Sequence, residues 1–331
     1  MEQRIGELMK TIRIPLEINA KAGNKILIIT DTGMDSSLWQ AMAAAAAELG
    51  MEPTIAIMTP RAAHGYDPTS PIIHAARDPD IDLYIYLTST AMAHAPLTAE
   101  LLDRGKRFIL MEELTPNMML PDGPAGADYV AMDVIGQKVA KLFSEGQRVR
   151  VQADNGTDLT ATIAGRPGRS VTAKIPAMRA NGGGGCAFPD GEAHVCPLEG
   201  TGEGTIVFDL TAHSVGALTE PIRITVEKGM ATKIEGGLQA AKWREILEKY
   251  GDTNSYNCPA EIAIGLNLNV TPTGSMRTDK KLYGSTHIGV GDTVVLGGTC
   301  HAKLRLEGVI KEPLITIDEK VVTKGGKIFV D

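Results

Sequence analysis

The sequence predicts two domains, an N-terminal α/β domain with a parallel sheet and a β-rich α+β domain that carries the functional site. Over residues 1–146, short apolar runs alternate with helical segments, which is typical of a parallel sheet. Over residues 147–331, polar and apolar residues alternate with period two, which indicates antiparallel strands. The length of 331 residues is also greater than that of one average domain.

The N-terminal domain is predicted from four apolar runs, each of a length that suits one buried strand. These runs are KILIIT at 25–30, TIAIM at 54–58, DLYIYL at 82–87 and RFILM at 107–111. Helices are expected between them, at 38–49 and 98–104. The segment after the first run, TDTGMDSS, lacks the glycine spacing of a dinucleotide-binding fingerprint. A Rossmann-type cofactor is therefore not expected.

Two histidines follow strands of this predicted sheet. His64 comes after the second strand and His94 after the third. Ligands of open parallel sheets bind beyond the carboxyl ends of the strands. We therefore expect His94 to be a catalytic residue and His64 to bind substrate.

The C-terminal domain is predicted from a hairpin and the strands that follow it. The segment 148–165 alternates around Asn155 and Gly156, a pair that favours a tight hairpin turn. Further strands are expected at 204–210, 222–236 and 314–322. One helix, at 238–250, interrupts them.

Composition excludes several classes of protein. The net charge is −7 and aromatic residues make up 4% of the chain, so neither a basic stripe nor a base-stacking platform for nucleic acid is expected. No segment is apolar over the length that a membrane helix needs, and the N-terminus does not resemble a signal peptide. We expect a cytoplasmic enzyme with a small-molecule substrate. The four cysteines are Cys186, Cys196, Cys258 and Cys300, and free thiols are expected at these positions.

Four glycine-flanked motifs in the C-terminal domain carry the candidate site. The motifs are FPDGEAHVCP with Glu192, NCPAEIAIGLN with Glu261, DKKLYGSTHIGVG with His287, and GGTCHAKLRLEGVIKEPLITID with Glu307. Carboxylate and imidazole are ligand types that a divalent metal uses. The sequence therefore predicts a metal site formed by these four residues.

Taken in order, the four motifs resemble the aminopeptidase T family of metallopeptidases. The same superfamily contains the iron-dependent 2,5-dihydroxypyridine 5,6-dioxygenases. In the first half, the segment MAHAPLTAELLDRGKRFILMEELTP resembles the dioxygenase branch around an active-site histidine, which is His94 here. The resemblance also implies a homodimer.

The peptidase resemblance implies that Glu192, Glu261 and His287 bind zinc, cobalt or manganese. The next two ligands of the peptidases fall on Arg305 and Glu307 of this sequence. Glu307 can still bind a metal, whereas Arg305 cannot, because a guanidinium has no free lone pair.

The dioxygenase resemblance implies Fe(II) held by two histidines and one aspartate. Those positions fall on Glu261, Arg305 and Glu307, so all three differ in this chain. If the last motif is a strand, His301 and Lys303 share a face with Arg305. His301 would then be a substitute ligand.

Other residues of these motifs are candidates for binding the substrate. Lys303 and Arg305 would hold the carboxylate of a small acidic substrate. Tyr283 would donate a hydrogen bond to a developing oxyanion.

The leading hypothesis is a hydrolase that acts on a small amide, amino-acid or heterocycle-derived substrate. A metal would activate water, and Glu192, His94 and Arg305 would be catalytic. The second hypothesis is a non-haem iron dioxygenase that cleaves a ring. The third is a descendant that has lost its metal and binds a small ligand, with Arg305 pairing the clustered carboxylates.

Overall fold

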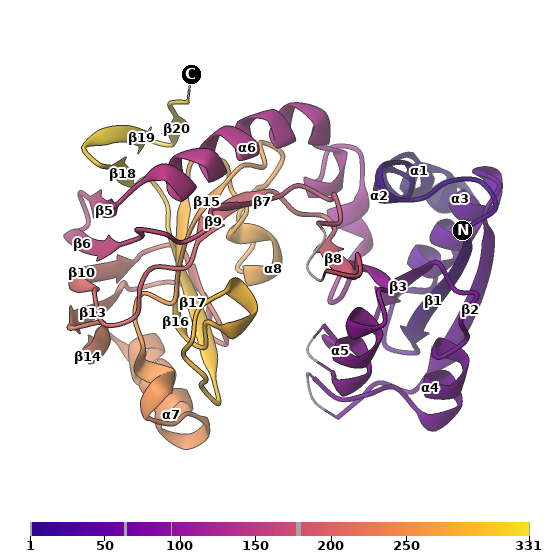
Figure 1. Ribbon diagram of the computed structural model, residues 1–331, viewed down its shortest axis with the longest axis horizontal. Coiled ribbons are helices and arrows are strands. Elements are labelled where there is room, and N and C mark those ends of the chain that lie inside the picture. The colour runs from indigo at the N-terminus through magenta and orange to yellow at the C-terminus, as the bar shows by residue number, and fades with distance from the viewer. Residues whose placement is uncertain (1, 63–64, 94, 177–179, 331) are drawn as a thin grey trace. The chain divides into compact units, whose positions relative to one another are not determined.

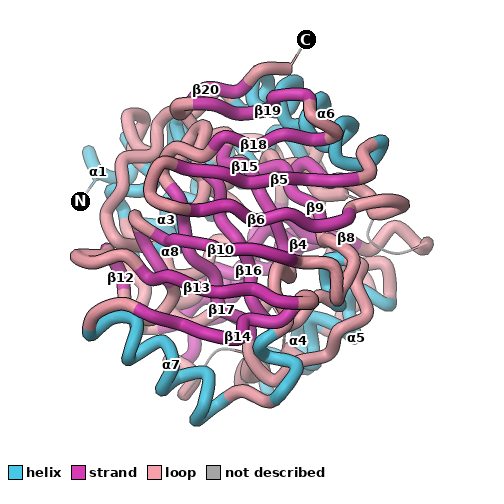
Figure 2. The backbone as a smooth tube through the Cα atoms, turned by 90° about the vertical axis from the view of Figure 1, so that its left-hand side faces the viewer, coloured by secondary structure: helices cyan, strands magenta, loops and turns pink. Residues whose placement is uncertain are grey.

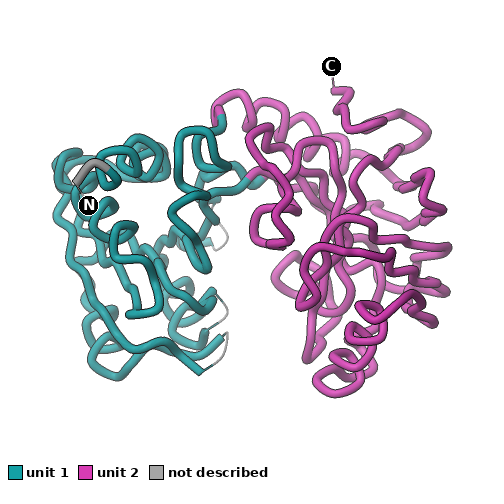
Figure 3. Tube along the Cα trace, turned by 180° about the vertical axis from the view of Figure 1, so that it is seen from behind, with its two compact units in different colours: residues 1–127, 171–190 teal, residues 128–170, 191–331 magenta. Residues whose placement is uncertain are grey.

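A computed structural model describes residues 2–62, 65–93, 95–176 and 180–330 (Figure 1). The chain forms two compact units (Figure 3). Unit 1 comprises Met1–Ala127 and Val171–Asp190, and unit 2 comprises Asp128–Ser170 and Gly191–Asp331. No helix among the described residues is long and apolar enough to cross a membrane.

Unit 1 is built on a parallel sheet, as predicted. Its strands lie in the order β2-β1-β3-β4-β8, and each neighbouring pair is parallel. The strands are β1 (Lys25–Asp31), β2 (Glu52–Met58), β3 (Leu83–Leu87), β4 (Arg107–Leu110) and β8 (Gly184–Ala187). The first four correspond to the four predicted apolar runs.

Helices accompany these strands along the chain. They are α1 (Glu2–Ile12), α2 (Ile14–Asn19), α3 (Ser36–Glu48), α4 (Ser70–Ala76), α5 (Pro96–Asp103) and the short 3₁₀ helices η1 (Pro116–Met119) and η2 (Pro124–Gly126). The Asp35 side chain caps α3 by accepting a hydrogen bond from the backbone N–H of Ser37 at 2.9 Å. Tyr84, Tyr86 and Phe108 form stacked and edge-on ring contacts in the core of this unit.

Unit 2 contains two large sheets. The eight-stranded sheet has the order β14-β13-β10-β6-β5-β18-β19-β20, and its strands lie side by side in Figure 2. Its strands are β5 (Arg148–Ala153), β6 (Thr157–Thr162), β10 (Glu203–Phe208), β13 (Ile222–Glu227), β14 (Met230–Glu235), β18 (Leu314–Ile317), β19 (Lys320–Lys324) and β20 (Lys327–Ile328). The predicted antiparallel strands of the second half all belong to this sheet.

The seven-stranded sheet has the order β12-β11-β17-β16-β15-β9-β7. Its strands are β7 (Arg169–Val171), β9 (Glu192–Val195), β11 (Thr211–Ala212), β12 (Gly216–Ala217), β15 (Glu261–Gly265), β16 (Thr286–Gly291) and β17 (Arg305–Ile310). The four central strands, β9, β15, β16 and β17, pair antiparallel with one another. Each of them lies within one of the four motifs of the sequence.

The helices of unit 2 are α6 (Tyr129–Glu145), α7 (Leu238–Tyr250), α8 (Met276–Asp279), η3 (Thr253–Tyr256) and η4 (Val294–Leu296). Helix α7 has the predicted bounds. Its buried Trp243 packs edge-on against Phe208 and donates a hydrogen bond to the carbonyl oxygen of His213.

The division into units differs from the predicted boundary at residue 146 in two places. Helix α6 belongs to unit 2, because it packs against β9. Strand β8 belongs to unit 1, because it pairs with β4. The glycines at 182–185 extend into a strand, because Gly184 and Gly185 form part of β8. A Cβ at Gly184 would lie 1.9 Å from the carbonyl oxygen of Pro176, so this close approach requires glycine.

Candidate metal and active site

Four neighbouring strands of the seven-stranded sheet bring the motif residues to one face. In the ladder, Gly289 is opposite both Glu261 and Glu307. Ala263 is opposite both His194 and His287. Directly opposite residues, and residues two apart on one strand, face the same side of a sheet. The register therefore gathers the acids and histidines of the candidate site on one side.

Three buried carboxylates in this cluster are each paired with a cation. Lys281 donates a hydrogen bond to Oε2 of Glu192, and Arg305 donates one to Oε2 of Glu261. Arg305 also lies 3.1 Å from Oε1 of Glu307, whose Oε2 accepts a hydrogen bond from Lys280 at 2.8 Å. The side chains of the cluster thus carry three negative and three positive charges.

These pairs keep the groups charged. Burial alone would raise the pKa of each carboxyl, but the charge of Lys281 holds the pKa of Glu192 well below its usual value. At Glu261, burial also raises the pKa, but the charge of Arg305 outweighs this effect and the pKa is lowered to about 2. Burial opposes the charge of Lys280, but the neighbouring Glu307 raises the pKa of its ammonium group. The cluster is therefore ionised at neutral pH.

Glycine in β16 makes room for the guanidinium group. A Cβ added at Gly289 would lie 2.7 Å from Nη2 of Arg305 and 3.0 Å from its Cζ. The side chain of Arg305 is held further by a hydrogen bond from its Nη1 to the carbonyl oxygen of Asp292 at 2.6 Å. Glycine at position 289 therefore lets the guanidinium of Arg305 lie between Glu261 and Glu307.

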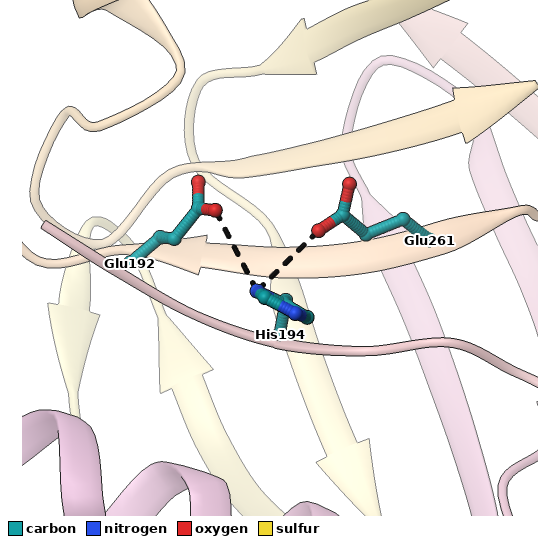
Figure 4. Close-up of side chains that lie close together, drawn as sticks. All are labelled: Glu192, His194 and Glu261. Atoms are coloured by element: carbon teal, nitrogen blue, oxygen red, sulfur yellow. Dashed lines mark ion pairs between the residues drawn. The ribbon is translucent and has the colours of Figure 1, made fainter. Parts of the chain in front are cut away.

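Two buried histidines face the same carboxylates. The residue exposure is 5% for His194 and 0% for His287. Nδ1 of His194 lies 3.5 Å from Oε1 of Glu192 and 3.5 Å from Oε1 of Glu261 (Figure 4). Nε2 of His287 lies 3.5 Å from Oε2 of Glu261. These distances exceed the 2.7–2.9 Å that is typical of a charge-assisted hydrogen bond.

Three of the four ring nitrogens of these histidines lack hydrogen-bond partners among the described residues. Among the described residues, neither nitrogen of His194 forms a hydrogen bond, and neither does Nε2 of His287. Buried polar atoms are normally satisfied, so atoms like these indicate a site where another group binds.

A third histidine, His213, lies beside Glu307 in the turn after β11. Its Nδ1 accepts a hydrogen bond from the backbone N–H of Glu307 at 3.0 Å. Burial is the main cause that lowers the pKa of His213 to about 4. The ring is therefore neutral at physiological pH and carries its proton on Nε2.

The structure brings together five of the predicted residues: Glu192, Glu261, His287, Arg305 and Glu307. His301 and Lys303 do not share a strand face with Arg305, because the strand begins only at Arg305. The partner strand β16 ends at Gly291, which is paired with Arg305, so the ladder stops there. His301 and Lys303 lie in the preceding loop and are exposed. The binding roles expected of His301 and Lys303 remain predictions.

Three other predicted residues are not among these five. His64 and His94 are outside the described residues. Tyr283 is half-buried in the turn before β16, where its backbone N–H donates to the carbonyl oxygen of Asn267 at 3.1 Å. The roles proposed for these residues remain predictions.

The cysteines are free thiols, as expected. Cys186, Cys196 and Cys258 are buried, and Cys300 is half-buried. Burial raises the pKa of Cys196 to about 11, so this thiol is not poised as a nucleophile.

Four residues of the site were not predicted from the sequence: His194, His213, Lys280 and Lys281. Signals were present for three of them. Lys280 and Lys281 are adjacent within the motif that supplies His287, and His194 is two residues after Glu192 on the same strand. Only the folded structure shows that these groups meet.

The side chains form two overlapping groups that suit a metal ion. Glu192, His194 and Glu261 make one group, and Glu261, His287 and Glu307 make the other. In each group the ligand atoms lie within 4.8 Å of one another. Imidazole and carboxylate are also the ligands of non-haem Fe(II). Together with the unpartnered ring nitrogens, this donor set fits a divalent metal such as iron.

A protein-family model matches nearly the whole length of the chain. The model of a family described as NicX, 2,5-dihydroxypyridine 5,6-dioxygenase, matches residues 8–329. A 2,5-dihydroxypyridine 5,6-dioxygenase from Pseudomonas putida is 22% identical over 255 residues, which are 72% of this chain and 68% of the relative.

Two solved structures share the fold. The 2,5-dihydroxypyridine dioxygenase from Pseudomonas putida superposes with a TM-score of 0.80 at 19% identity, over 99% of this chain and 98% of the other. Wild-type AmpT from Thermus thermophilus superposes with a TM-score of 0.71 at 12% identity, over 98% of this chain and 99% of the other. At these identities, the superpositions establish a common fold.

Proposed function

Because the chain belongs to the 2,5-dihydroxypyridine 5,6-dioxygenase family, we propose that it is a metal-dependent dioxygenase that opens a small hydroxylated aromatic or heteroaromatic ring. One observation carries the proposal. Within a chain that matches this family over residues 8–329, buried imidazole and carboxylate donors converge on one face of a sheet.

The leading expectation of a hydrolase is wrong. The family model and the curated relative both carry the dioxygenase description. The likeness to AmpT, at 12% identity, concerns the fold alone. The resemblance of the first half to the dioxygenase branch agrees with the matched family, whereas the peptidase resemblance of the second half does not.

Glu261 is central to metal binding, because its carboxylate belongs to both groups of ligand atoms. Each group adds one histidine and one further glutamate. A bound ferrous ion would supply the oxygen chemistry, which protein side chains lack. The four ligands predicted from the sequence, Glu192, Glu261, His287 and Glu307, are divided between these two groups.

The cations of the site would bind an anionic substrate. The side chains of Arg305 and Lys280 remain partly exposed, at 19% and 21%, whereas that of Lys281 is 5% exposed. A ring hydroxyl that has lost its proton carries a negative charge, which a nearby cation stabilises. We therefore expect Arg305 and Lys280 to orient the ring by its ionised oxygen.

His213 would supply a hydrogen bond. Its Nδ1 is occupied by the backbone N–H of Glu307, so Nε2 carries the hydrogen. The side chain is 36% exposed, which leaves it accessible to a ligand. A neutral imidazole in this position can donate a hydrogen bond from Nε2 to a developing oxyanion.

The proposal is tested by oxygen consumption. Metal-free protein would be loaded anaerobically with Fe(II) and mixed with 2,5-dihydroxypyridine and with benzene-ring analogues that carry two hydroxyl groups. We expect stoichiometric oxygen uptake together with loss of the aromatic absorbance of at least one compound. Lys280→Met should raise the KM for the ionised substrate. Iron-loaded protein that consumes no oxygen with any of these compounds would contradict the proposal.

A further inference from the structure

We infer that the metal ion in this chain binds at Glu192, His194 and Glu261, so that His194 is a metal ligand. The inference rests on the proposed function and deepens it, because it chooses between the two overlapping groups of ligand atoms. Three observations support the choice. They are which carboxylate oxygens accept hydrogen bonds from cations, the lack of hydrogen bonds to His194 among the described residues, and the side to which β9 directs its side chains.

The group that contains Glu307 already holds two cations. Oε1 of Glu307 accepts a hydrogen bond from Nε of Arg305 at 3.1 Å, and Oε2 accepts one from Lys280 at 2.8 Å. Both oxygens of this carboxylate are therefore engaged. A metal ion that binds Glu307 would therefore have to displace one of these cations from its oxygen.

The group that contains His194 has two carboxylate oxygens directed at the ring. Lys281 and Arg305 donate their hydrogen bonds to Oε2 of Glu192 and Oε2 of Glu261, respectively. The other oxygen of each carboxylate, Oε1, lies 3.5 Å from Nδ1 of His194 (Figure 4). Three donor atoms thus converge, and the cations contact the far side of both carboxylates.

The spacing of these atoms suits a shared metal ion. Two ligand atoms that are each about 2.1 Å from a tetrahedral metal lie roughly 3.4 Å apart. The observed 3.5 Å matches this spacing. His194 is 5% exposed and neither of its nitrogens is hydrogen-bonded among the described residues, so a metal would satisfy an otherwise unpaired atom.

Backbone pairing holds the three ligands in place. Glu192 and His194 are two residues apart on β9, so both side chains point to the same face. In the ladder, β9 pairs with β15, which begins at Glu261. Ligands on paired strands are better ordered than ligands on loops, so this position is organised before the metal arrives.

The inference is tested by Co(II) binding to metal-free protein, followed by the visible absorption of the bound ion. We expect His194→Ala to weaken Co(II) binding on the order of 100-fold and to change the absorption spectrum, because one nitrogen ligand is lost. His194→Asn, which keeps a polar side chain, should show the same loss. His74→Ala removes an exposed histidine of α4 and should bind Co(II) like the wild type.

A second variant separates the two groups without changing His194. Glu307→Gln should keep Co(II) affinity close to that of the wild type, because Glu307 is engaged by Arg305 and Lys280. Circular dichroism would check that each variant is folded. Wild-type affinity in folded His194→Ala, or a loss in Glu307→Gln as large as that expected for His194→Ala, would overturn the inference.

The outcomes also separate this inference from the proposed function. Metal binding that depends on His194, without oxygen uptake on any ring compound, would support the site and contradict the dioxygenase activity. Oxygen uptake in a protein whose metal affinity is unaffected by His194→Ala would support the dioxygenase activity and contradict the metal site at His194. Wild-type protein that binds neither Co(II) nor Fe(II) would overturn both.

Discussion

Arg305 contacts Glu261 and Glu307, and its guanidinium fits against Gly289 of the neighbouring strand. The sequence alone indicated that an arginine here would pair with clustered acids, because guanidinium cannot bind a metal. It also indicated Glu192, Glu261 and His287 as members of one site. Lys280 and Lys281 were not foreseen, because a lysine next to a buried acid looks like any surface lysine until the fold is known.

Removing the arginine should increase metal affinity. In Arg305→Met, Oε2 of Glu261 loses its cation, so the carboxylate becomes a stronger ligand. We expect Co(II) binding to tighten on the order of 10-fold, as changes beside metal ligands commonly alter affinity. Titration followed by absorption would measure it. Arg150→Met, which breaks the exposed pair with Asp158, is the matched control, and equal affinities in the two variants would contradict the prediction.

At the scale of the element, local pattern identified four of the five strands of unit 1, the hairpin β5–β6 and the bounds of α7. It did not identify β8, because a run of glycines has no side-chain periodicity to show a strand. Helix α6 went unnoticed although its buried residues have helical spacing: Tyr129, Met132, Gly136, Val139, Ala140 and Phe143. The pairing of β9 with β15 joins segments far apart in sequence, which local pattern cannot reveal.

The loop between β16 and β17 depends on one carboxylate outside the site. Glu199 accepts hydrogen bonds from Oγ1 of Thr293 and from the backbone N–H of Thr299, each at 2.7 Å. Burial opposes its charge, yet these hydrogen bonds and the nearby Arg166 lower the pKa of Glu199 from 4.5 to about 2. The loop that precedes Arg305 is thereby tied down.

This depressed pKa predicts a dependence of stability on pH. A carboxyl group that is more acidic in the folded state stabilises the fold above its unfolded pKa, and the stabilisation is lost as pH falls through the folded pKa. The contribution of Glu199 should therefore be present above about pH 4.5 and fade towards pH 2. Urea unfolding at several pH values should show this loss in the wild type and a smaller one in Glu199→Gln. Parallel curves for the two proteins would argue against it.

At the scale of the whole molecule, the sequence predicted that an α/β domain precedes a β-rich domain. It did not predict that the chain passes from unit 2 back into unit 1. Residues 171–190 return to unit 1 after the chain has entered unit 2. That return is made by β8, the strand with no sequence signal. The homodimer implied by the family resemblance remains a prediction.

The balance of charge in the site predicts how the protein responds to metal removal. Lys280, Lys281 and Arg305 offset three buried carboxylates without a metal ion. We expect a chelator to abolish oxygen uptake and to leave the thermal unfolding midpoint little changed. Scanning calorimetry with and without chelator would measure it, and a large drop in the midpoint would show that the fold requires the metal.

The same arrangement bears on life under iron starvation. Many small metalloproteins are unfolded until their ion arrives, so a shortage of the ion exposes them to proteolysis. Here the lysines and the arginine are synthesised with the chain and serve as built-in counterions. If the ion is iron, as proposed, folded protein made during the shortage is loaded when iron returns, without new synthesis.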